Sequence, residues 1–174
     1  MALASGLQKL SLILGGARSG KSRYAEELMA SEAPPWAYIA TAQAFDDEMR
    51  ARIAQHRARR AESWVTLEAP LDLAGSIGSL DPSQPVLVDC LTLWLSNLML
   101  GAHDLQAQFA ALDQAIDRHK GPVVMVSNEV GLGIVPENAL ARAFRDEQGR
   151  LNQRIAARAD RVVLMVAGLP LQVK

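Results

Sequence analysis

The stretch LSLILGGARSGKS, residues 10–22, begins with a short, mainly apolar run and ends in a turn that is rich in glycine. The apolar run, Leu10–Leu14, is typical of a strand that is buried on both faces of a parallel sheet. The turn, residues 15–22, matches the pattern G-x-x-x-x-G-K-[ST] at every fixed position. This pattern joins a strand to a helix through a loop that binds phosphate. The stretch therefore predicts an α/β fold.

The chemistry of a phosphate-binding loop explains each residue type in this turn. Glycines let the backbone curl so that successive N–H groups point at phosphate oxygens. We expect Lys21 to reach the β- and γ-phosphates of a nucleotide and the Ser22 hydroxyl to bind Mg²⁺. The alternative is a tight turn without a ligand, but such a turn would need neither side chain. The predicted loop consists of Gly15, Gly16, Ala17, Arg18, Ser19, Gly20, Lys21 and Ser22, with Arg23 as a further candidate for a phosphate contact.

A nucleotide loop of this kind also needs a carboxylate near its Mg²⁺. The apolar segment 86–88 is followed by Asp89. We expect its strand to lie beside the strand of the phosphate loop, which would bring Asp89 close to Ser22. The alternative is that Asp89 caps the helix predicted at 91–100. The adjacent Cys90 is interpreted as a small buried residue rather than as a nucleophile.

Apolar runs alternate with amphipathic patterns along the rest of the chain. This alternation predicts βαβ units, and therefore a mainly parallel central sheet that is flanked by helices. We expect a single P-loop domain over residues 10–174, after a leader at 1–9. Further strands are predicted at 36–40, 64–67, 86–90, 122–127 and 161–167, and helices at 24–29, 49–56, 91–100, 105–116 and 140–155.

Composition excludes several classes of protein. The 174 residues are 49% hydrophobic and 21% charged, which is typical of a globular domain and not of a disordered chain. The net charge of −1 argues against a nucleic-acid partner, and the one cysteine excludes a disulfide framework. Neither the N-terminal segment nor the apolar stretch Leu91–Leu100 fits a signal peptide or a membrane span. We therefore expect a cytoplasmic protein without stable membrane insertion.

His56 lies in the segment DDEMRARIAQHRARR, residues 46–60, which has acidic residues first and arginines last, as a helix dipole prefers. Its spacing from Met49 and Ile53 puts His56 on the face of a helix that turns toward the protein. Neighbouring arginines depress the pKa of a histidine, which keeps the imidazole neutral and nucleophilic. They also suit a phosphate that is being attacked. From the spacing alone, a plain amphipathic helix remains the alternative.

Four blocks of sequence together resemble the bifunctional adenosylcobinamide kinase/adenosylcobinamide-phosphate guanylyltransferases of cobalamin biosynthesis. The blocks are GGARSGKSRYAEE (15–27), YIATAQAFDDEMRARIAQHRARR (38–60), VDCLTLWLSNLM (88–99) and SNEVGLGIVPENALARAFRDEQGRLNQRIAARADRVVLMVAG (127–168). The phosphate loop alone would not select this family, because the second and fourth blocks are far more specific. The resemblance extends over nearly the whole chain, from Leu10 to Lys174.

The resemblance implies a P-loop NTPase fold of the RecA-like type, a homotrimer and two reactions. ATP or GTP phosphorylates adenosylcobinamide, and GTP then transfers GMP to that phosphate through a guanylylated histidine, which matches His56. Glu68 could accept hydrogen bonds from a guanine edge; the alternative is a surface glutamate. Beyond the phosphate loop, the nucleotide contacts that the family implies are Ala40, Thr41, Ala42, Arg57, Ala58, Arg59, Arg60, Glu68 and Asp89.

Two other interpretations stay open beside this one. The chain could be a P-loop kinase of small molecules without nucleotidyl transfer, or a nucleotide-binding switch without turnover. The blocks around His56 and Asn128 argue against the switch, because a protein without turnover would have no use for these family-specific residues. A single domain of this size has little room for two separate catalytic sites. We therefore expect one triphosphate site that serves both steps, with the corrinoid held partly by a neighbouring subunit.

The region after the strand at 122–127 adds a further hypothesis. Asn128 and Glu129 stand at a strand end, where α/β sheets place their ligands. Gly131 and Gly133 make the following loop a candidate for binding the corrinoid or gating the site, the alternative being a structural turn. The next helix carries a stripe of arginines that we expect to be solvated or subunit-facing, with the first two as candidates for phosphate contact. The stripe consists of Arg142, Arg145, Arg150, Arg154 and Arg158.

Overall fold

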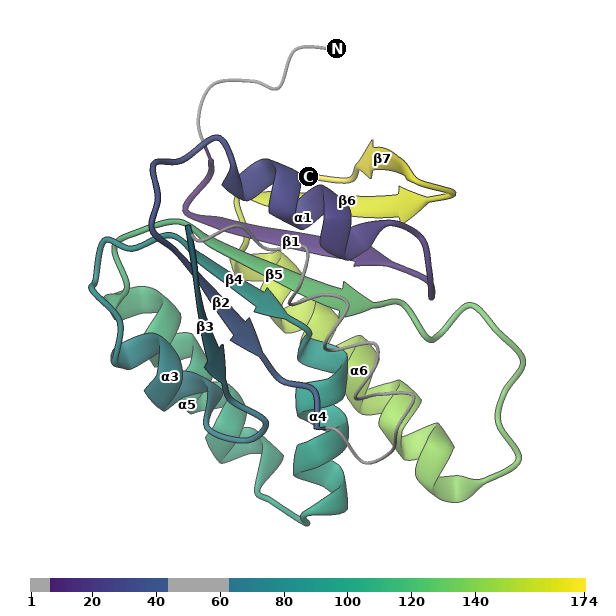
Figure 1. Ribbon diagram of the computed structural model, residues 1–174. Coiled ribbons are helices and arrows are strands. Elements are labelled where there is room, and N and C mark those ends of the chain that lie inside the picture. The colour runs from purple at the N-terminus through teal and green to yellow at the C-terminus, as the bar shows by residue number, and fades with distance from the viewer. Residues whose placement is uncertain (1–6, 44–62) are drawn as a thin grey trace.

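The computed structural model describes residues 7–43 and 63–174, and a sheet of seven strands forms its centre (Figure 1). The strands are β1 (Leu10–Gly15), β2 (Trp36–Ala40), β3 (Trp64–Glu68), β4 (Val86–Asp89), β5 (Val123–Asn128), β6 (Arg161–Val166) and β7 (Leu169–Gln172). Their order across the sheet is β3-β2-β4-β5-β1-β6-β7. The first six strands in this order run parallel, and only β7 is antiparallel to its neighbour β6. The mainly parallel sheet that the sequence predicts is confirmed.

Helices cover both faces of the sheet. Within the described residues they are α1 (Lys21–Met29), α3 (Leu73–Gly78), α4 (Leu91–Leu100), α5 (Leu105–Arg118) and α6 (Ala139–Arg158). The helix α1 packs on one face with its buried residues Ala25, Leu28 and Met29, while the other four helices contribute to a larger core on the opposite face (Figure 1). None of the described helices is long and apolar enough to cross a membrane.

The sheet lies between two hydrophobic cores, one beneath α1 and a larger one beneath the other four helices. This position explains why its central strands are mainly apolar in sequence. Leu12 of β1 belongs to the larger core, and its neighbour Ile13 belongs to the core beneath α1; neither is exposed to solvent. Successive side chains of a strand point to opposite faces, so a strand between two helical layers is apolar at most positions. The runs in β4 and β5 follow the same rule, with the buried Ser11 of β1 and Ser127 of β5 as exceptions.

The position of β4 corrects one expectation from the sequence. β4 does not lie beside β1, because β5 lies between them and pairs with both. A parallel strand can be reached only by a crossover connection, and an apolar run does not state how many positions the crossover spans. β5 therefore lies between the strand that leads into the phosphate loop and the strand that ends in Asp89.

Two described elements were not predicted from the sequence. The short helix α3 begins after Asp72, whose side chain accepts a hydrogen bond from the backbone N–H of Gly75. The strand β7 forms a hairpin with β6 through a turn at Ala167 and Gly168, both of which have positive φ. Neither element has the length or periodicity that distinguishes a helix or a strand in a sequence.

Candidate active site

The carboxyl ends of the parallel strands bring the predicted site residues to one edge and one face of the sheet. The register pairs Gly15 with Asn128, and Asp89 with Ala40, which in turn pairs with Glu68. Asp89 also pairs with the residue two positions before Asn128. Residues in register, and residues two apart on a strand, share a face of the sheet. The five residues therefore lie on the face that α1 covers: Gly15, Ala40, Glu68, Asp89 and Asn128. Ligands bind at this edge in α/β folds.

The loop between β1 and α1 has a backbone that only glycine fits at two positions. Gly15 and Gly20 have φ of 151° and 94°. A Cβ on Gly15 would lie 2.6 Å from Ser19 Oγ and 2.7 Å from the Met165 carbonyl oxygen, so any side chain would collide there. The turn between β6 and β7 supports the loop from outside, because the N–H of Gly168 donates to the Ser19 carbonyl over 3.0 Å.

Lys21, the first residue of α1, is buried within this loop. Its Nζ donates a hydrogen bond to the carbonyl of Gly16. Burial lowers the pKa of Lys21, an effect that the nearby Cys90 and Asp89 partly oppose. Ser19 is also buried, and among the described residues its hydroxyl finds no hydrogen-bond partner. A buried ammonium beside an orphaned hydroxyl and a curled backbone is a suitable receptor for phosphate oxygens.

Asp89 is oriented by a neighbouring strand. Its Oδ2 accepts a hydrogen bond of 2.9 Å from the hydroxyl of Tyr38. The alternative in which Asp89 caps the next helix is wrong, because Cys90 occupies the N-cap of α4. Ser22 and Asp89 offer a hydroxyl and a carboxylate, and Mg²⁺ in proteins is held by one or two such groups together with waters and substrate phosphates. The described residues contain no cluster of three or more histidines, cysteines or acids that could hold a metal without those phosphates.

The turn after β2 is anchored to the strand end that carries Asp89. The buried Thr41 donates its hydroxyl to the Cys90 carbonyl over 2.7 Å and accepts from the Cys90 N–H over 2.9 Å. Asn97 of α4 donates from Nδ2 to the Thr41 carbonyl. Asn97 was missed in the sequence, although a polar residue in an otherwise apolar helix is a usable signal. The predicted segment Ala40, Thr41 and Ala42 therefore has a defined position beside the end of β4.

Cys90 is a buried residue, as the sequence predicts. It is 8% exposed, and burial raises the pKa of its thiol to about 11, with the Asp89 charge acting in the same direction. A thiol with this pKa is protonated at neutral pH and is a poor nucleophile.

Several arginines singled out in the sequence form contacts within the chain: Arg23 and Arg142, which were candidates for phosphate contact, and two of the stripe expected to be solvated or subunit-facing. Arg23 forms an exposed ion pair with Glu27 one turn along α1. Arg142 donates to the carbonyls of residues 136 and 137, which braces the loop before α6. Arg154 and Arg158 form ion pairs with acidic residues of α5, Asp113 for both and Asp117 for Arg158. The arginine-rich segment Arg57, Ala58, Arg59 and Arg60, together with His56, lies outside the described residues.

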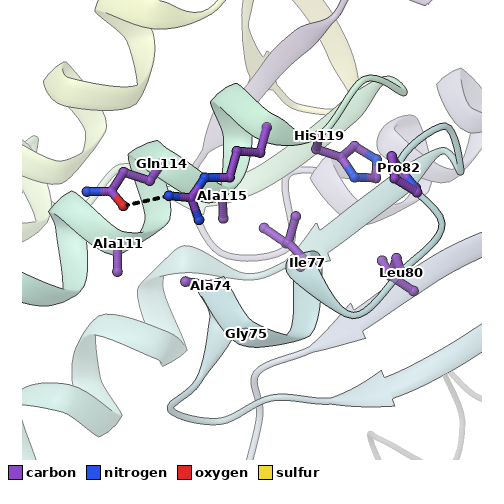
Figure 2. Close-up of a pocket in the computed structure, with 11 residues that line it drawn as sticks. Ala74, Gly75, Ile77, Leu80, Pro82, Ala111, Gln114, Ala115 and His119 are labelled. Atoms are coloured by element: carbon purple, nitrogen blue, oxygen red, sulfur yellow. Dashed lines mark hydrogen bonds between the residues drawn. The ribbon is translucent and has the colours of Figure 1, made fainter.

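A cavity of about 500 Å³ lies elsewhere, between α3 and α5 (Figure 2). Its lining is mainly apolar, with Ile77 and Leu80 on one side and Ala111 and Ala115 on the other. Its polar rim is engaged internally, because Arg118 donates to Gln114 and the ring nitrogen Nε2 of His119 lies 2.8 Å from the Gln84 carbonyl oxygen. None of the predicted site residues lines this cavity, so it is distinct from the strand edge that carries the phosphate loop.

Solved structures with similar folds support the fold class. The flagellar accessory protein FlaH from Methanocaldococcus jannaschii matches with a TM-score of 0.54 at 11% identity, covering 98% of this chain and 80% of that one. An ATPase from the type III secretion system of pathogenic bacteria matches with a TM-score of 0.56 at 11% identity, covering 97% of this chain and 57% of that one. At these identities the similarity shows the fold alone, and it confirms the predicted RecA-like P-loop NTPase fold.

Sequence comparisons identify the family. The "Bifunctional adenosylcobalamin biosynthesis protein CobP" of Pseudomonas aeruginosa is 52% identical over 166 residues, covering 94% of this chain and 96% of that protein. The "Bifunctional adenosylcobalamin biosynthesis protein CobU" of Salmonella typhimurium is 46% identical over 179 residues, covering 94% and 98%. A family described as "Cobinamide kinase / cobinamide phosphate guanyltransferase" matches residues 11–173. The chain therefore belongs to the cobinamide kinase and cobinamide phosphate guanyltransferase family.

Proposed function

We propose that this chain catalyses two successive transfers in cobalamin biosynthesis. In the first, ATP or GTP phosphorylates the hydroxyl of adenosylcobinamide; in the second, GTP transfers GMP to that phosphate to give adenosylcobinamide-GDP. The observation that carries the proposal is the phosphate loop with its buried Lys21 beside Asp89, in a chain that matches this family over residues 11–173. Phosphoryl transfer depends mainly on positioning and on neutralising charge, which is what this loop supplies.

Different residues of the chain would bind the phosphates, the Mg²⁺ and the guanine base of the nucleotide. The backbone N–H groups of residues 15–20 and the Lys21 ammonium would bind the phosphates, with the Ser19 hydroxyl free to accept or donate one more hydrogen bond. Ser22 and Asp89 would hold Mg²⁺, which neutralises phosphate charge when it is bound. Glu68, at the end of β3 on the same face of the sheet as Asp89, would accept hydrogen bonds from a guanine edge.

We assign the second transfer to His56. Its ring nitrogen would attack the α-phosphorus of GTP, forming an N–P bond while the bond to the β-phosphate oxygen breaks and pyrophosphate leaves. An oxygen of adenosylcobinamide phosphate would then attack the same phosphorus, breaking the N–P bond and restoring the imidazole. The arginines at 57, 59 and 60 would neutralise the equatorial oxygens in both steps. This assignment depends on the sequence, because the segment lies outside the described residues.

The corrinoid and a neighbouring subunit would meet at the loop after β5. Leu132, Ile134 and Val135 are 86%, 98% and 57% exposed, next to the strand end that carries Asn128. Exposed apolar side chains beside a site usually mark a surface that a ligand or partner covers. We propose that this loop contacts the corrinoid within a homotrimer, and that one triphosphate site serves both steps. Since nucleoside triphosphates are made in the cytoplasm, we place the enzyme there.

One labelling experiment tests the proposal. The protein is incubated with Mg²⁺ and GTP labelled at the α-phosphate, denatured and examined for bound label, beside a His56→Ala variant. An adduct that is stable to alkali, labile to acid and absent from the variant supports the two-step mechanism. A chain that phosphorylates adenosylcobinamide but never takes up label is a kinase without nucleotidyl transfer. A chain with neither activity is a nucleotide-binding switch.

A further inference from the structure

One side chain of α4 joins the turns that follow two neighbouring strands. Nδ2 of Asn97 donates one hydrogen bond to the Thr41 carbonyl, after β2, and another to the Pro70 carbonyl, after β3, each over 2.9 Å. Asn97 is 7% exposed, and the other buried residues of its helix are mainly apolar. An amide NH₂ group has two hydrogens to donate, and here each is directed to a different turn. Asn97 therefore bridges the ends of β2 and β3.

The turn after β3 is also held at two further points. The Ala69 N–H donates to the Ala40 carbonyl over 2.8 Å, which extends the pairing of β2 with β3 by one hydrogen bond. The ring nitrogen of Trp94, which is also in α4, donates to the Leu71 carbonyl over 2.8 Å. Glu68 comes directly before this turn, at the end of β3. The backbone that carries its carboxylate is therefore anchored by the strand on one side and by the turn on the other.

The bridge uses a buried amide where α4 could have an apolar residue. An apolar side chain would pack there without the desolvation cost of an amide. Carbonyl groups of turns, for their part, commonly face water at the surface. Here the carbonyls of Thr41 and Pro70 accept from Asn97 instead, which fixes the distance between their turns. That distance matters because the two turns adjoin the proposed nucleotide contacts, residues 40–42 and Glu68.

We propose that Asn97 is a positioning residue for the selection of guanine: it holds the Glu68 carboxylate in a fixed place relative to residues 40–42, which would contact the same nucleotide. A carboxylate can accept from two N–H groups of guanine, at N1 and at the exocyclic amine. Adenine has an acceptor at N1, which a carboxylate repels. A pair of hydrogen bonds to one base edge requires an accurately placed acceptor. This inference rests on the proposed contact between Glu68 and a guanine edge.

Binding measurements with three probes test this role. The probes are GDP, inosine diphosphate, which lacks the exocyclic amine, and pyrophosphate, which has no base. Each is titrated with Mg²⁺ into the full-length protein and into Asn97→Leu. We expect the unaltered protein to bind GDP about tenfold more tightly than inosine diphosphate, because the inosine base makes one hydrogen bond fewer to a charged group. In Asn97→Leu this ratio should fall below about threefold, with the affinity for pyrophosphate unchanged.

Asp104→Ala is the matched control. It also removes two hydrogen bonds between one side chain and the backbone, those that Asp104 accepts from the N–H groups of Gln106 and Ala107 at the start of α5. It should lower the midpoint of denaturant unfolding, as Asn97→Leu does, but keep the affinity ratio of GDP to inosine diphosphate. If Asn97→Leu fails to fold, Asn97→Ser replaces it, because the smaller side chain leaves room for water at the two carbonyls. The ratio should fall in this variant as well.

Turnover separates positioning of the base from catalysis. Asn97→Leu should raise KM for GTP about tenfold with kcat for corrinoid phosphorylation little changed, because Lys21 and Asp89 keep hydrogen bonds of their own. An unchanged affinity ratio in this variant, or equal losses for all three probes, would overturn the inference. If the unaltered protein binds GDP and inosine diphosphate equally, Glu68 does not contact the amine, and the inference fails while the two proposed transfers stand. If it binds none of the probes, the proposed function fails, and the inference with it.

Discussion

The hydroxyl of Tyr38 donates to Oδ2 of Asp89 over 2.9 Å, so the carboxylate at the end of β4 is held by a side chain from the neighbouring strand β2. Tyr38 is itself buried, with its ring edge-on to Trp64 at a centroid distance of 6.0 Å. A rigid aromatic ring thus fixes one carboxylate oxygen of Asp89. We expect the other oxygen to contact the proposed Mg²⁺ or water bound to it.

We expect Tyr38→Phe to raise the Mg²⁺ concentration needed for half-maximal kinase activity about threefold to tenfold, because one hydrogen bond to the carboxylate is lost. Asp89→Asn should raise it further, since the charge itself disappears. The measurement is a Mg²⁺ titration of corrinoid phosphorylation at saturating nucleotide. Tyr24→Phe, which changes the other tyrosine of the chain, is the control and should behave as the unaltered protein. An unchanged titration for Asp89→Asn would contradict its metal role.

Lys21 is expected to lower the stability of the free protein. Because burial lowers the pKa of Lys21 below 10.5, its protonated form costs folding free energy at neutral pH. This cost diminishes as the pH rises through the lowered pKa toward 10.5. We expect Lys21→Met to stabilise the free protein by on the order of 1 kcal/mol at pH 7, an advantage that shrinks at high pH.

Urea unfolding of the unaltered protein and of Lys21→Met, each with and without GTP, measures the four free energies of unfolding. GTP should stabilise the unaltered protein and leave Lys21→Met unaffected, because the ammonium that binds phosphate is gone. A variant that is less stable than the parent without nucleotide, or that still responds fully to GTP, would refute the prediction.

Thr41 should be sensitive to the loss of its hydroxyl rather than to its shape. Thr41→Val keeps the volume but leaves the N–H of Cys90 buried without a partner, while the Cys90 carbonyl keeps only the hydrogen bond from the Trp94 N–H. We therefore expect a loss of about 2–3 kcal/mol in the free energy of unfolding. Thr41→Ser keeps the hydroxyl and should lose about 1 kcal/mol, from the deleted methyl group. Denaturant titration compares the two. Equal losses would mean that packing, and not the hydrogen bonds to Cys90, decides the role of Thr41.

Cys90 should resist alkylation in the folded protein. With the pKa raised to about 11, almost no thiolate exists at pH 8, and the side chain is buried as well. We expect iodoacetamide to label the unfolded chain quickly and the folded chain much more slowly, as mass spectrometry would show. Labelling of the folded protein should increase as the pH approaches 11. Rapid labelling at pH 8 would show that the thiol is exposed or activated.

Local patterns were enough to predict much of the fold and of the nucleotide site. The apolar runs identified β1, β2, β4, β5 and β6, because a strand between two helical layers must be mainly apolar. The glycine pattern identified the phosphate loop, since its backbone conformation and the Lys21 contact are made within eight residues. The role of His56 stays a prediction, because its segment lies outside the described residues.

The missed residues have a common property. Tyr38, Asn97 and Asn152 act through hydrogen bonds to residues that are at least 24 positions away in the chain. Tyr38 and Asn97 could be recognised in the sequence only as polar residues within apolar elements, and that signal does not name a partner. Asn152 does not stand out at all, because its helix α6 is rich in polar residues.

The sequence by itself determined the elements of this protein: which segments are strands, and where the glycine-rich turn joins β1 to α1. Spacing along the chain is sufficient for these, because each depends on neighbouring residues. Only the tertiary structure decided that β5 lies between β1 and β4, and therefore that Asn128, and not a residue of β4, faces Gly15. Strand order results from the packing of both helical layers and from buried hydrogen bonds between distant segments, which no local pattern encodes.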